Sequence, residues 1–314
     1  MNEPLALGID IGGTNTAYGF VNRRGEIISK GSISTLGHEN PAAYMKALGA
    51  ALLPEIERYE KENVIGTGIG APNGNFFTGN IIFAPNLPWK GIVIPMAEMA
   101  EETLGIKAVL TNDANAAAIG EMMYGAAKGM KDFILVTLGT GVGSGFVANG
   151  QLIYGHDGFA GELGHVIAIR NGRQCGCGRR GCLEAYTSAT GIVQTVNEWL
   201  SERTDETVLR ASNGALTAKM IFEAAERGDA FARELFDYTA KILGQTLADT
   251  VAITSPEAII FFGGLAKAGD LLLPAVKKYM EANLLNIYQN KVAILQSALP
   301  DADAAILGAS ALVW

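Results

Sequence analysis

The chain has 314 residues, of which 49% are hydrophobic and 18% charged, and its formal net charge is −8. This length is enough for two domains with buried cores, and the acidic balance argues against nucleic acid as a partner. The first residues, MNEPLALGIDIGG, include no basic segment, and no window reaches the roughly 20 apolar residues that cross a bilayer. We therefore expect no signal peptide and no membrane partner.

The first third of the chain alternates strand-like runs with turns and helices. Its first strands are joined by the glycine turn DIGGTNT and the polar turn RRGE. Apolar residues between Met45 and Tyr59 recur at helical spacing, and Pro54 should kink or divide that helix. In chain order we expect strands at 5–9, 17–22, 27–34, 64–72 and 108–113, and helices at 45–59 and 114–127.

The opening pattern of strand, glycine turn, strand, polar turn and strand returns at residues 133–155. The sequences GFVN at 19–22 and GFVAN at 145–149 occupy matching places in the two copies. A repeat of this length indicates two related halves rather than a solenoid. The second half continues with a cysteine-rich loop, a mostly helical stretch at 191–254, a strand at 257–264, a helix from about 269 and an amphipathic helix at 301–314.

The alternation of strands and helices predicts the α/β class, with two α/β domains flanking a cleft. Each half would open with one glycine-tipped hairpin. We assign residues 1–117 together with 301–314 to a small α/β domain, and residues 118–300 to a large α/β domain that contains the cysteine-rich loop.

Three glycine clusters lie at the ends of expected strands. Such turns aim several backbone N–H groups at one point and let phosphate oxygens approach closely. A simple tight turn is the better interpretation of any one cluster, but three together favour a nucleotide held between two hairpins. A P-loop motif is absent, and strand residues follow GTGVGSG where a dinucleotide-binding fold needs a helix. The clusters are DIGGTNT (10–16), LGTGVGSG (138–145) and FFGGLAKAG (261–269), with hydroxyl donors at Thr14, Thr16 and Thr140 and with Asp10 placed to hold Mg²⁺ through water.

Asn112 and Asp113 stand where an expected strand ends and an expected helix begins. One interpretation is a helix N-cap, a role that both residue types fill well. The other is a carboxylate in the cleft that accepts a proton from an attacking hydroxyl. A helix N-terminus lowers the basicity of a carboxylate, but phosphoryl transfer asks the base mainly to orient the nucleophile. The spacing alone leaves the two interpretations equal.

The stretch GELGHVIAIRNGRQCGCGRRGCLE contains all three cysteines of the chain and one of its three histidines. Three cysteines cannot all pair with one another, so we expect a reduced, cytoplasmic protein in which they bind metal rather than three buried free thiols. His165 with Cys175, Cys177 and Cys182 makes a closed, structural zinc set with no position left for a reactive water. The flanking Glu162 and Glu184 are either surface acids or acceptors for the hydroxyls of a polyol.

Taken together, these motifs resemble the ROK family (repressors, open reading frames, kinases) over essentially the whole chain, and within it the bacterial glucokinases. The resemblance rests on DIGGTNT, APNLPW, TNDANAAA, LGTGVGSG and FFGG, and most specifically on GELGH with CGCGRRGCLE. It implies the actin-like, hexokinase-like ATPase fold and phosphorylation of a hexose by Mg-ATP, with glucose at its 6-hydroxyl as the first expectation. Members of the family are commonly dimers or tetramers, so we expect a homodimer or homotetramer.

The family's residue roles transfer to the matching positions of this chain. Asp113 resembles the base that activates the sugar 6-hydroxyl, and His165 would both bind zinc and approach the sugar. The hexose contacts would be Asn86, Asn112, Asp113, Glu162, His165 and Glu184. The ATP contacts would be Asp10, Gly12, Gly13, Thr14, Gly139, Thr140 and Gly141, with Gly263 and Gly264 on the adenosine side. The structural Zn²⁺ ligands would be His165, Cys175, Cys177 and Cys182.

The chain departs from the family pattern in one turn, where Pro72-Asn73 stands in place of the usual Pro-Gly. That turn lies near the sugar in the family, so glucose, mannose, fructose, N-acetylglucosamine and N-acetylmannosamine remain open as substrates, as do ATP and polyphosphate as donors. A sugar-responsive repressor is disfavoured because the first hairpin begins close to Met1, without a preceding helix-turn-helix. A non-catalytic sugar sensor is disfavoured because Asp113 and all three glycine clusters are retained.

Overall fold

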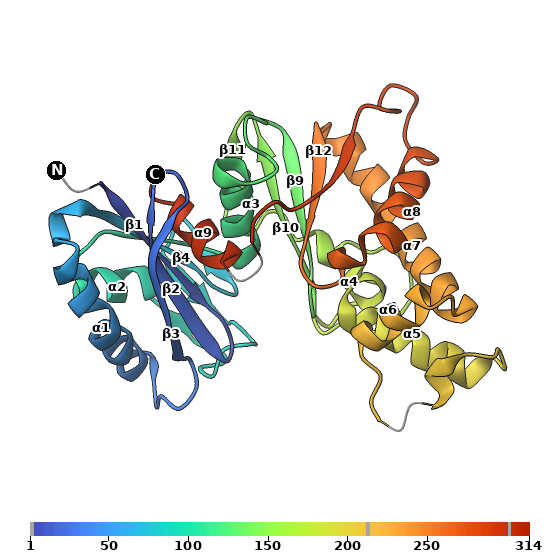
Figure 1. The fold of residues 1–314 in the computed structure, drawn as a ribbon, viewed down its shortest axis with the longest axis horizontal. Helices are drawn as coiled ribbons and strands as arrows, with labels where there is room; N and C mark the ends of the chain where they lie inside the picture. The colour runs from blue at the N-terminus through green and yellow to red at the C-terminus, as the bar shows by residue number, and fades with distance from the viewer. Residues whose placement is uncertain (1–2, 212–213, 301–302) are drawn as a thin grey trace. The chain divides into compact units, whose positions relative to one another are not determined.

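The computed structural model describes residues 3–211, 214–300 and 303–314. The chain forms two compact units, shown in Figure 1 with unit 1 mainly in blue and cyan and unit 2 mainly in green to orange. Unit 1 contains the residues up to Gly129, Leu152–Ala160 and the residues from Ala298 onward, and unit 2 contains Met130–Gln151 and Gly161–Ser297. No helix in these described ranges is long and apolar enough to span a bilayer.

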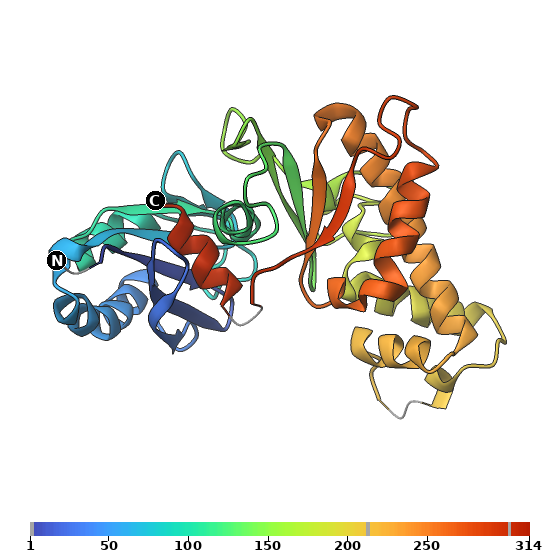
Figure 2. The same cartoon turned by 45° about the horizontal axis from the view of Figure 1, so that its top comes forward.

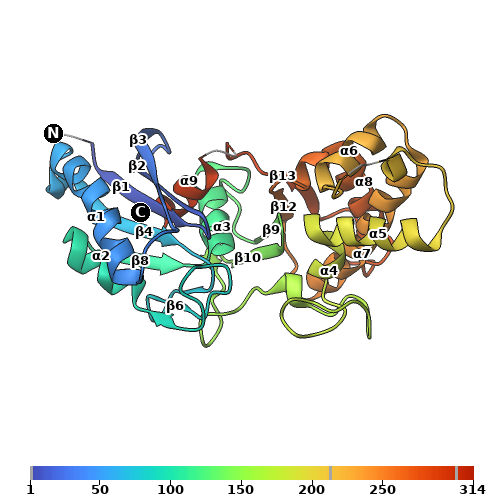
Figure 3. The same cartoon turned by 90° about the horizontal axis from the view of Figure 1, so that it is seen from below.

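Unit 1 is built on a five-stranded sheet of order β3-β2-β1-β4-β8, with a small second sheet of order β5-β6-β7 (Figure 3). Strands β1, β2 and β3 pair antiparallel, whereas β4 runs parallel to β1 and β8 parallel to β4. The bounds are β1 Leu5–Ile11, β2 Asn15–Asn22, β3 Ile27–Ser34, α1 Pro41–Arg58, η1 Lys61–Asn63, β4 Val64–Gly70, β5 Gly74–Asn75, β6 Asn80–Ile82, β7 Val93–Ile94, α2 Met96–Leu104, β8 Ala108–Thr111, α3 Asp113–Tyr124 and α9 Ala304–Ala311.

Helix α1 begins at an Asn40 cap, whose side-chain oxygen accepts a hydrogen bond from the Ala43 N–H. The helix runs without interruption to Arg58, with Pro54 inside it. The division at Pro54, one of the two predicted outcomes, therefore does not occur. Ala50 and Pro54 are both exposed, so water can satisfy the carbonyl that Pro54 leaves without a backbone partner.

The two faces of the unit 1 sheet are covered by different helices. Leu7 and Ile9 of β1 are fully buried in a core that includes residues of α1 and α2. Gly8 lies on the other face against α9, where an added Cβ atom would stand 2.3 Å from the Ile306 carbonyl oxygen. Since successive strand residues face opposite sides, glycine on one face lets the backbone of α9 lie directly on the sheet (Figure 2).

The closing helix differs from its prediction. An amphipathic helix was expected at 301–314, whereas residues 301–302 lie outside the described ranges and α9 is buried on almost every side, with only Ala305 exposed. The helix packs against both α3 and the sheet, and Gly308 of α9 approaches Gly120 of α3 closely. Burial between two layers, rather than at the edge of one, explains why α9 has no polar face.

Unit 2 is built on a five-stranded sheet of order β11-β10-β9-β12-β13, with helices packed around α7 and α8. β9 and β10 pair antiparallel, and β12 runs parallel to both β9 and β13. The bounds are β9 Phe133–Leu138, β10 Val142–Ala148, β11 Gln151–Leu152, η2 Leu163–His165, α4 Glu184–Thr187, α5 Ala189–Glu202, η3 Val208–Ala211, α6 Ala218–Glu226, α7 Ala230–Thr254, β12 Ala258–Phe262, η4 Ala266–Ala268, α8 Gly269–Glu281 and β13 Ala293–Gln296.

The two sheets have the same strand order, with the third, second, first, fourth and fifth strands of each half side by side. In both, the first two strands form an antiparallel hairpin and the fourth runs parallel to the first. The predicted duplication is therefore confirmed, and each half does open with a glycine-tipped hairpin.

The observed units differ from the predicted domain boundaries at three places, one of which is the last segment of unit 1, which begins at Ala298 rather than at residue 301. The expected boundary at residue 117 falls inside α3, which packs as a whole against α9 within unit 1, so unit 1 continues to Gly129. Residues 152–160 were assigned to the large domain but belong to unit 1. There the Tyr154 ring stacks on Phe76 with centroids 4.1 Å apart, and Asn75 Nδ2 donates to the Asp157 carbonyl at 2.6 Å.

Candidate active site and metal centre

The carboxyl ends of the parallel strands in unit 1 bring two acids together. Asp10 of β1 is paired in register with Gly70 of β4, and Gly70 with Thr111 of β8, two residues before Asp113. A Cβ atom on Gly70 would stand 3.7 Å from an Asp10 carboxylate oxygen and 3.8 Å from the Asp113 Cα. Gly70 thus lies between the two acids, at the edge where open α/β sheets bind ligands.

Both acids have raised pKa values. Burial, followed by the nearby negative charge of Asp113, raises the pKa of Asp10 from its ordinary value to about 7. Asp113 is exposed at the surface, but the protein that surrounds its carboxyl reduces hydration of the charged form and raises its pKa, and this effect outweighs the opposing hydrogen bond from the Ala114 N–H. Ionising both of these neighbouring carboxyls at once is energetically unfavourable. A hard cation such as Mg²⁺ would stabilise their ionised forms.

The raised pKa of Asp10 predicts how stability varies with pH in the absence of Mg²⁺. Between about pH 4 and pH 7 the native state holds a proton that the unfolded state has released, so the free energy of unfolding should fall as pH rises. Replacing Asp10 by Asn should remove a decline on the order of a few kcal/mol over that window. Urea unfolding at a series of pH values would measure it, with Asp249→Asn on the exposed face of α7 as control. An Asp10→Asn profile parallel to that of the unmodified protein would contradict the assignment.

Asn112 is the cap residue of α3. Its side-chain oxygen accepts a hydrogen bond from the Asn115 N–H at 2.7 Å. Asp113 is the first residue inside the helix, and its Oδ1 accepts from the Ala114 N–H at 2.9 Å. The N-cap interpretation is therefore confirmed for Asn112, and Asp113 is not needed as the cap of the helix.

The first glycine turn is tightly packed against the segment that contains Asn86. A Cβ atom on Gly13 would stand 2.5 Å from the Asn86 carbonyl oxygen, so only glycine permits this approach. Thr14 and Asn86 are both exposed. The prediction for Thr16 is wrong, because its hydroxyl is fully buried and bonds the hydroxyls of Thr35 at 2.9 Å and Tyr44 at 2.8 Å.

The second glycine turn lies in unit 2 between β9 and β10. The Gly139 carbonyl accepts from the Ala189 N–H at 2.8 Å, and the Thr140 carbonyl accepts from the Thr190 hydroxyl at 2.7 Å. These bonds tie the turn to the start of α5 and leave the Thr140 side chain exposed. The third cluster lies beside it, since the Leu265 N–H that follows Gly263 and Gly264 donates to the carbonyl of Leu138.

The predicted metal ligands converge in unit 2. One side-chain donor atom from each of the four residues lies within 4.8 Å of the others. Cys177 Sγ and Cys182 Sγ are 3.6 Å apart, and Cys175 Sγ is 3.8 Å from His165 Nδ1. Burial raises the pKa of the Cys175 thiol to about 12, so a cation is needed to bring it to the thiolate form. Three sulfurs and one nitrogen at this spacing fit a tetrahedral Zn²⁺ ion.

Glu184 connects the metal ligands to the second glycine turn, a contact that the sequence analysis missed. Its Oε2 accepts from the Val142 N–H at 2.9 Å, and its Oε1 lies 3.9 Å from Cys175 Sγ. Glu162 is exposed just before η2, and its carbonyl accepts from the His165 N–H. Glu162, His165 and Glu184 therefore stand around one end of the cysteine loop.

Arg173 was also missed, although it holds the loop in place without metal. Its guanidinium pairs with Glu198 of α5, lies 4.5 Å from the centre of the Tyr186 ring, and donates to the Ala185 carbonyl. The side chain is only 9% exposed. The sequence shows four arginines in the stretch 161–184 with nothing to distinguish Arg173, because the distinction depends on tertiary burial.

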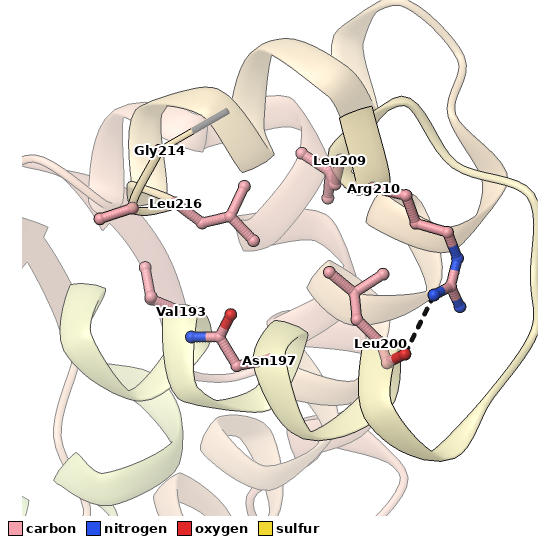
Figure 4. Close-up of a pocket in the computed structure, with 8 residues that line it drawn as sticks. Val193, Asn197, Leu200, Leu209, Arg210, Gly214 and Leu216 are labelled. Carbon is pink, nitrogen blue, oxygen red and sulfur yellow. Dashed lines mark hydrogen bonds between the residues drawn. The ribbon is translucent and has the colours of Figure 1, made fainter. Parts of the chain in front are cut away.

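The predicted residues divide between the units. Unit 1 contains Asp10, Gly12, Gly13, Thr14, Asn86, Asn112 and Asp113, and unit 2 contains Gly139, Thr140, Gly141, Glu162, His165, Cys175, Cys177, Cys182, Glu184, Gly263 and Gly264. A cavity of about 420 Å³ in unit 2 contains none of them. It is lined by polar and apolar groups alike and lies between α5 and η3, where Arg210 donates to the Leu200 carbonyl (Figure 4).

The duplicated sheets with their glycine-tipped hairpins define the actin-like, hexokinase-like ATPase fold. The ROK family profile matches residues 6–314. The chain is 39% identical over 291 residues to a glucokinase of Halalkalibacterium halodurans, covering 91% of this chain and 88% of the relative. It is 32% identical over 278 residues to an N-acetylmannosamine kinase of Shigella boydii, covering 87% of each. A solved ROK family glucokinase from Streptomyces griseus, in complex with glucose and AMPPNP, is similar at a TM-score of 0.80 and 33% identity, with 98% of both chains covered. The chain belongs to the ROK family, as its motifs predicted.

Proposed function

We propose that the chain is an ATP-dependent sugar kinase that transfers the γ-phosphoryl group of ATP to the 6-hydroxyl of a hexose, most readily glucose. The observation that carries the proposal is Asp113, an acid with a raised pKa that begins α3 beside Asp10 while Asn112 caps the helix. An acid in this setting suits the deprotonation of a hydroxyl. The similarity to glucokinases along nearly the whole chain supports glucose as the substrate.

In the proposed reaction, Asp113 orients the 6-hydroxyl and accepts its proton as the hydroxyl oxygen attacks the γ-phosphorus, giving hexose 6-phosphate and ADP. The backbone N–H groups of the two glycine hairpins hold the phosphates, and Gly263 and Gly264 lie on the adenosine side. Asp10 would hold Mg²⁺ through water, and the ion supplies positive charge to the β- and γ-phosphate oxygens.

Polar side chains would recognise the sugar hydroxyls. The Asn112 side-chain oxygen is engaged in the helix cap, so its amide group is the part available to the sugar. His165 has Nδ1 toward Cys175, which leaves Nε2 for the sugar. Asn86, Glu162 and Glu184 complete the proposed set.

The proposed metal is a structural Zn²⁺ ion held by His165 and the three cysteines, which keeps Glu184 in place rather than taking part in the chemistry. The free thiols support a reducing, cytoplasmic location. The family resemblance supports a homodimer or homotetramer, and the net charge of −8 argues against nucleic acid as a partner.

An N-acetylated hexose is the second candidate substrate, favoured by the similarity to N-acetylmannosamine kinases. A panel of glucose, mannose, fructose, N-acetylglucosamine and N-acetylmannosamine, each with Mg-ATP and with polyphosphate, separates the candidates by ADP or phosphate release. We expect the highest kcat/KM for glucose with ATP. Turnover of an N-acetylated sugar above glucose would favour the second candidate, and turnover of no sugar would refute the kinase proposal.

A further inference from the structure

Asn73 occupies a backbone conformation that favours glycine. It lies in the turn that follows β4, and its φ angle is +52°. Asparagine tolerates this left-handed region better than most residues, but glycine enters it without strain. The backbone geometry therefore does not by itself account for a side chain at this position.

The side chain of Asn73 makes contacts that glycine lacks. Its Nδ2 donates to the Ile82 carbonyl at 3.0 Å and reaches the Phe83 carbonyl at 3.5 Å. In return, the Asn73 carbonyl accepts from the Ile82 N–H at 3.1 Å. The turn after β4 is thus joined by both backbone and side chain to the place where β6 ends.

Phe83 is the residue whose backbone conformation this contact stabilises. Its φ angle is +51° and its side chain is 58% exposed, an uncommon and strained state for a bulky residue that persists only when its surroundings hold it. Two groups do so: the Ile92 carbonyl accepts from the Phe83 N–H at 3.1 Å, and Asn73 donates to the Phe83 carbonyl.

The strained residue begins the segment that contains Asn86. Leu87 and Trp89 anchor the far end of the segment in the unit 1 core, and between these anchors and Phe83 the Asn86 side chain is exposed. The Asn86 carbonyl rests against Gly13 of the first glycine turn. A change of direction at Phe83 would therefore move Asn86 relative to that turn.

We propose that Asn73 is a positioning residue for hexose binding, which fixes the Phe83 backbone and thereby the place of Asn86. The inference rests on the proposed function, because that function gives Asn86 its contact with the sugar. Asn73 acts through Phe83 and need not touch the substrate. It should therefore affect hexose binding, while the nucleotide contacts and the proton transfer at Asp113 remain unchanged.

The test compares Asn73→Gly and Asn73→Asp with Asn149→Gly. Asn149 also has a φ angle of +52°, but it lies in the turn between β10 and β11, away from the proposed site. The glycine variants lose the same side chain and gain the same unfolded-state freedom. The aspartate variant keeps the shape of the side chain but replaces the donor by a negatively charged acceptor. Since a hydrogen bond contributes about 1 kcal/mol, we expect both Asn73 variants to raise the hexose KM about fivefold. Their kcat should stay within about twofold of the unmodified protein, with the KM for ATP unchanged.

Amide hydrogen exchange gives a second readout that needs no substrate. The backbone amides of Phe83, Ala84 and Asn86 should exchange about fivefold faster in both Asn73 variants and at the original rate in Asn149→Gly. Unchanged exchange together with an unchanged hexose KM would overturn the proposal, as would an equal rise in KM in the Asn149 variant. If the unmodified protein phosphorylates no sugar, the proposed function fails, and the exchange rates still decide whether Asn73 holds the segment.

Discussion

Replacing Asp113 by Asn is expected to lower kcat for hexose phosphorylation by at least about 100-fold. The amide keeps the shape of the side chain and can still accept from the Ala114 N–H, but it cannot take the proton of the sugar hydroxyl. Because Asn112 caps α3, the substitution should leave the stability of the helix nearly unchanged. Steady-state kinetics with glucose and Mg-ATP would measure the loss, and calorimetry should find hexose binding retained.

Asp249→Asn is a suitable control, since that acid is exposed on α7 in the other unit. The raised pKa of Asp113 also predicts that the activity of the unmodified protein falls as pH is lowered through it, because only the ionised carboxylate accepts a proton. An Asp113→Asn variant with near-normal kcat would refute its assignment as the base.

The second large effect is expected from the metal centre. Protein purified without added metal should contain about one zinc per chain, and its removal by a chelator should destabilise unit 2 by several kcal/mol. At about 2 °C or more per kcal/mol, this corresponds to a fall in Tm on the order of 10 °C. Hexose affinity should fall at least about tenfold, because Glu184 and His165 lose the ion that orients them. Arg173 still ties the loop to α4 and α5, so we expect a weakened rather than an unfolded unit.

Cys177→Ala separates the metal from the sugar contacts, because Cys177 is an exposed ligand with no proposed role toward the hexose. It should reproduce the effects of chelation, whereas His156→Ala, which changes an exposed histidine outside the cluster, should not. Metal-free protein with unchanged Tm and hexose affinity would contradict the structural role of the site.

The fold was predictable where local patterns repeat. A strand, a glycine turn and a second strand occur twice in the sequence, and each becomes the first hairpin of a sheet with the same strand order. The closing helix was predicted incorrectly because its burial depends on distant residues. Because Gly8 and Gly68 have no side chains, α9 can pack directly against the backbone of the sheet. No pattern within residues 301–314 reveals that these glycines lie beside the helix.

The candidate site was predictable where the chemistry of a residue is itself distinctive. A histidine and three cysteines in one stretch indicated a metal site, and their donor atoms do converge. Hydroxyl groups were less predictable: Thr14 and Thr16 are two residues apart in one motif, yet Thr16 faces a buried network with Tyr44. The contacts of Arg173 and Glu184 were not foreseen, because an ion pair or a carboxylate–amide bond is defined only once the partner is placed by folding.

The most direct test of the central claim is to incubate the unmodified protein with glucose and Mg-ATP and to identify the product by ³¹P nuclear magnetic resonance. We expect ADP and glucose 6-phosphate in equal amounts, formed at a rate that depends on Asp113. ATP hydrolysis without a sugar phosphate, or no reaction with glucose or any other hexose of the panel, would contradict it.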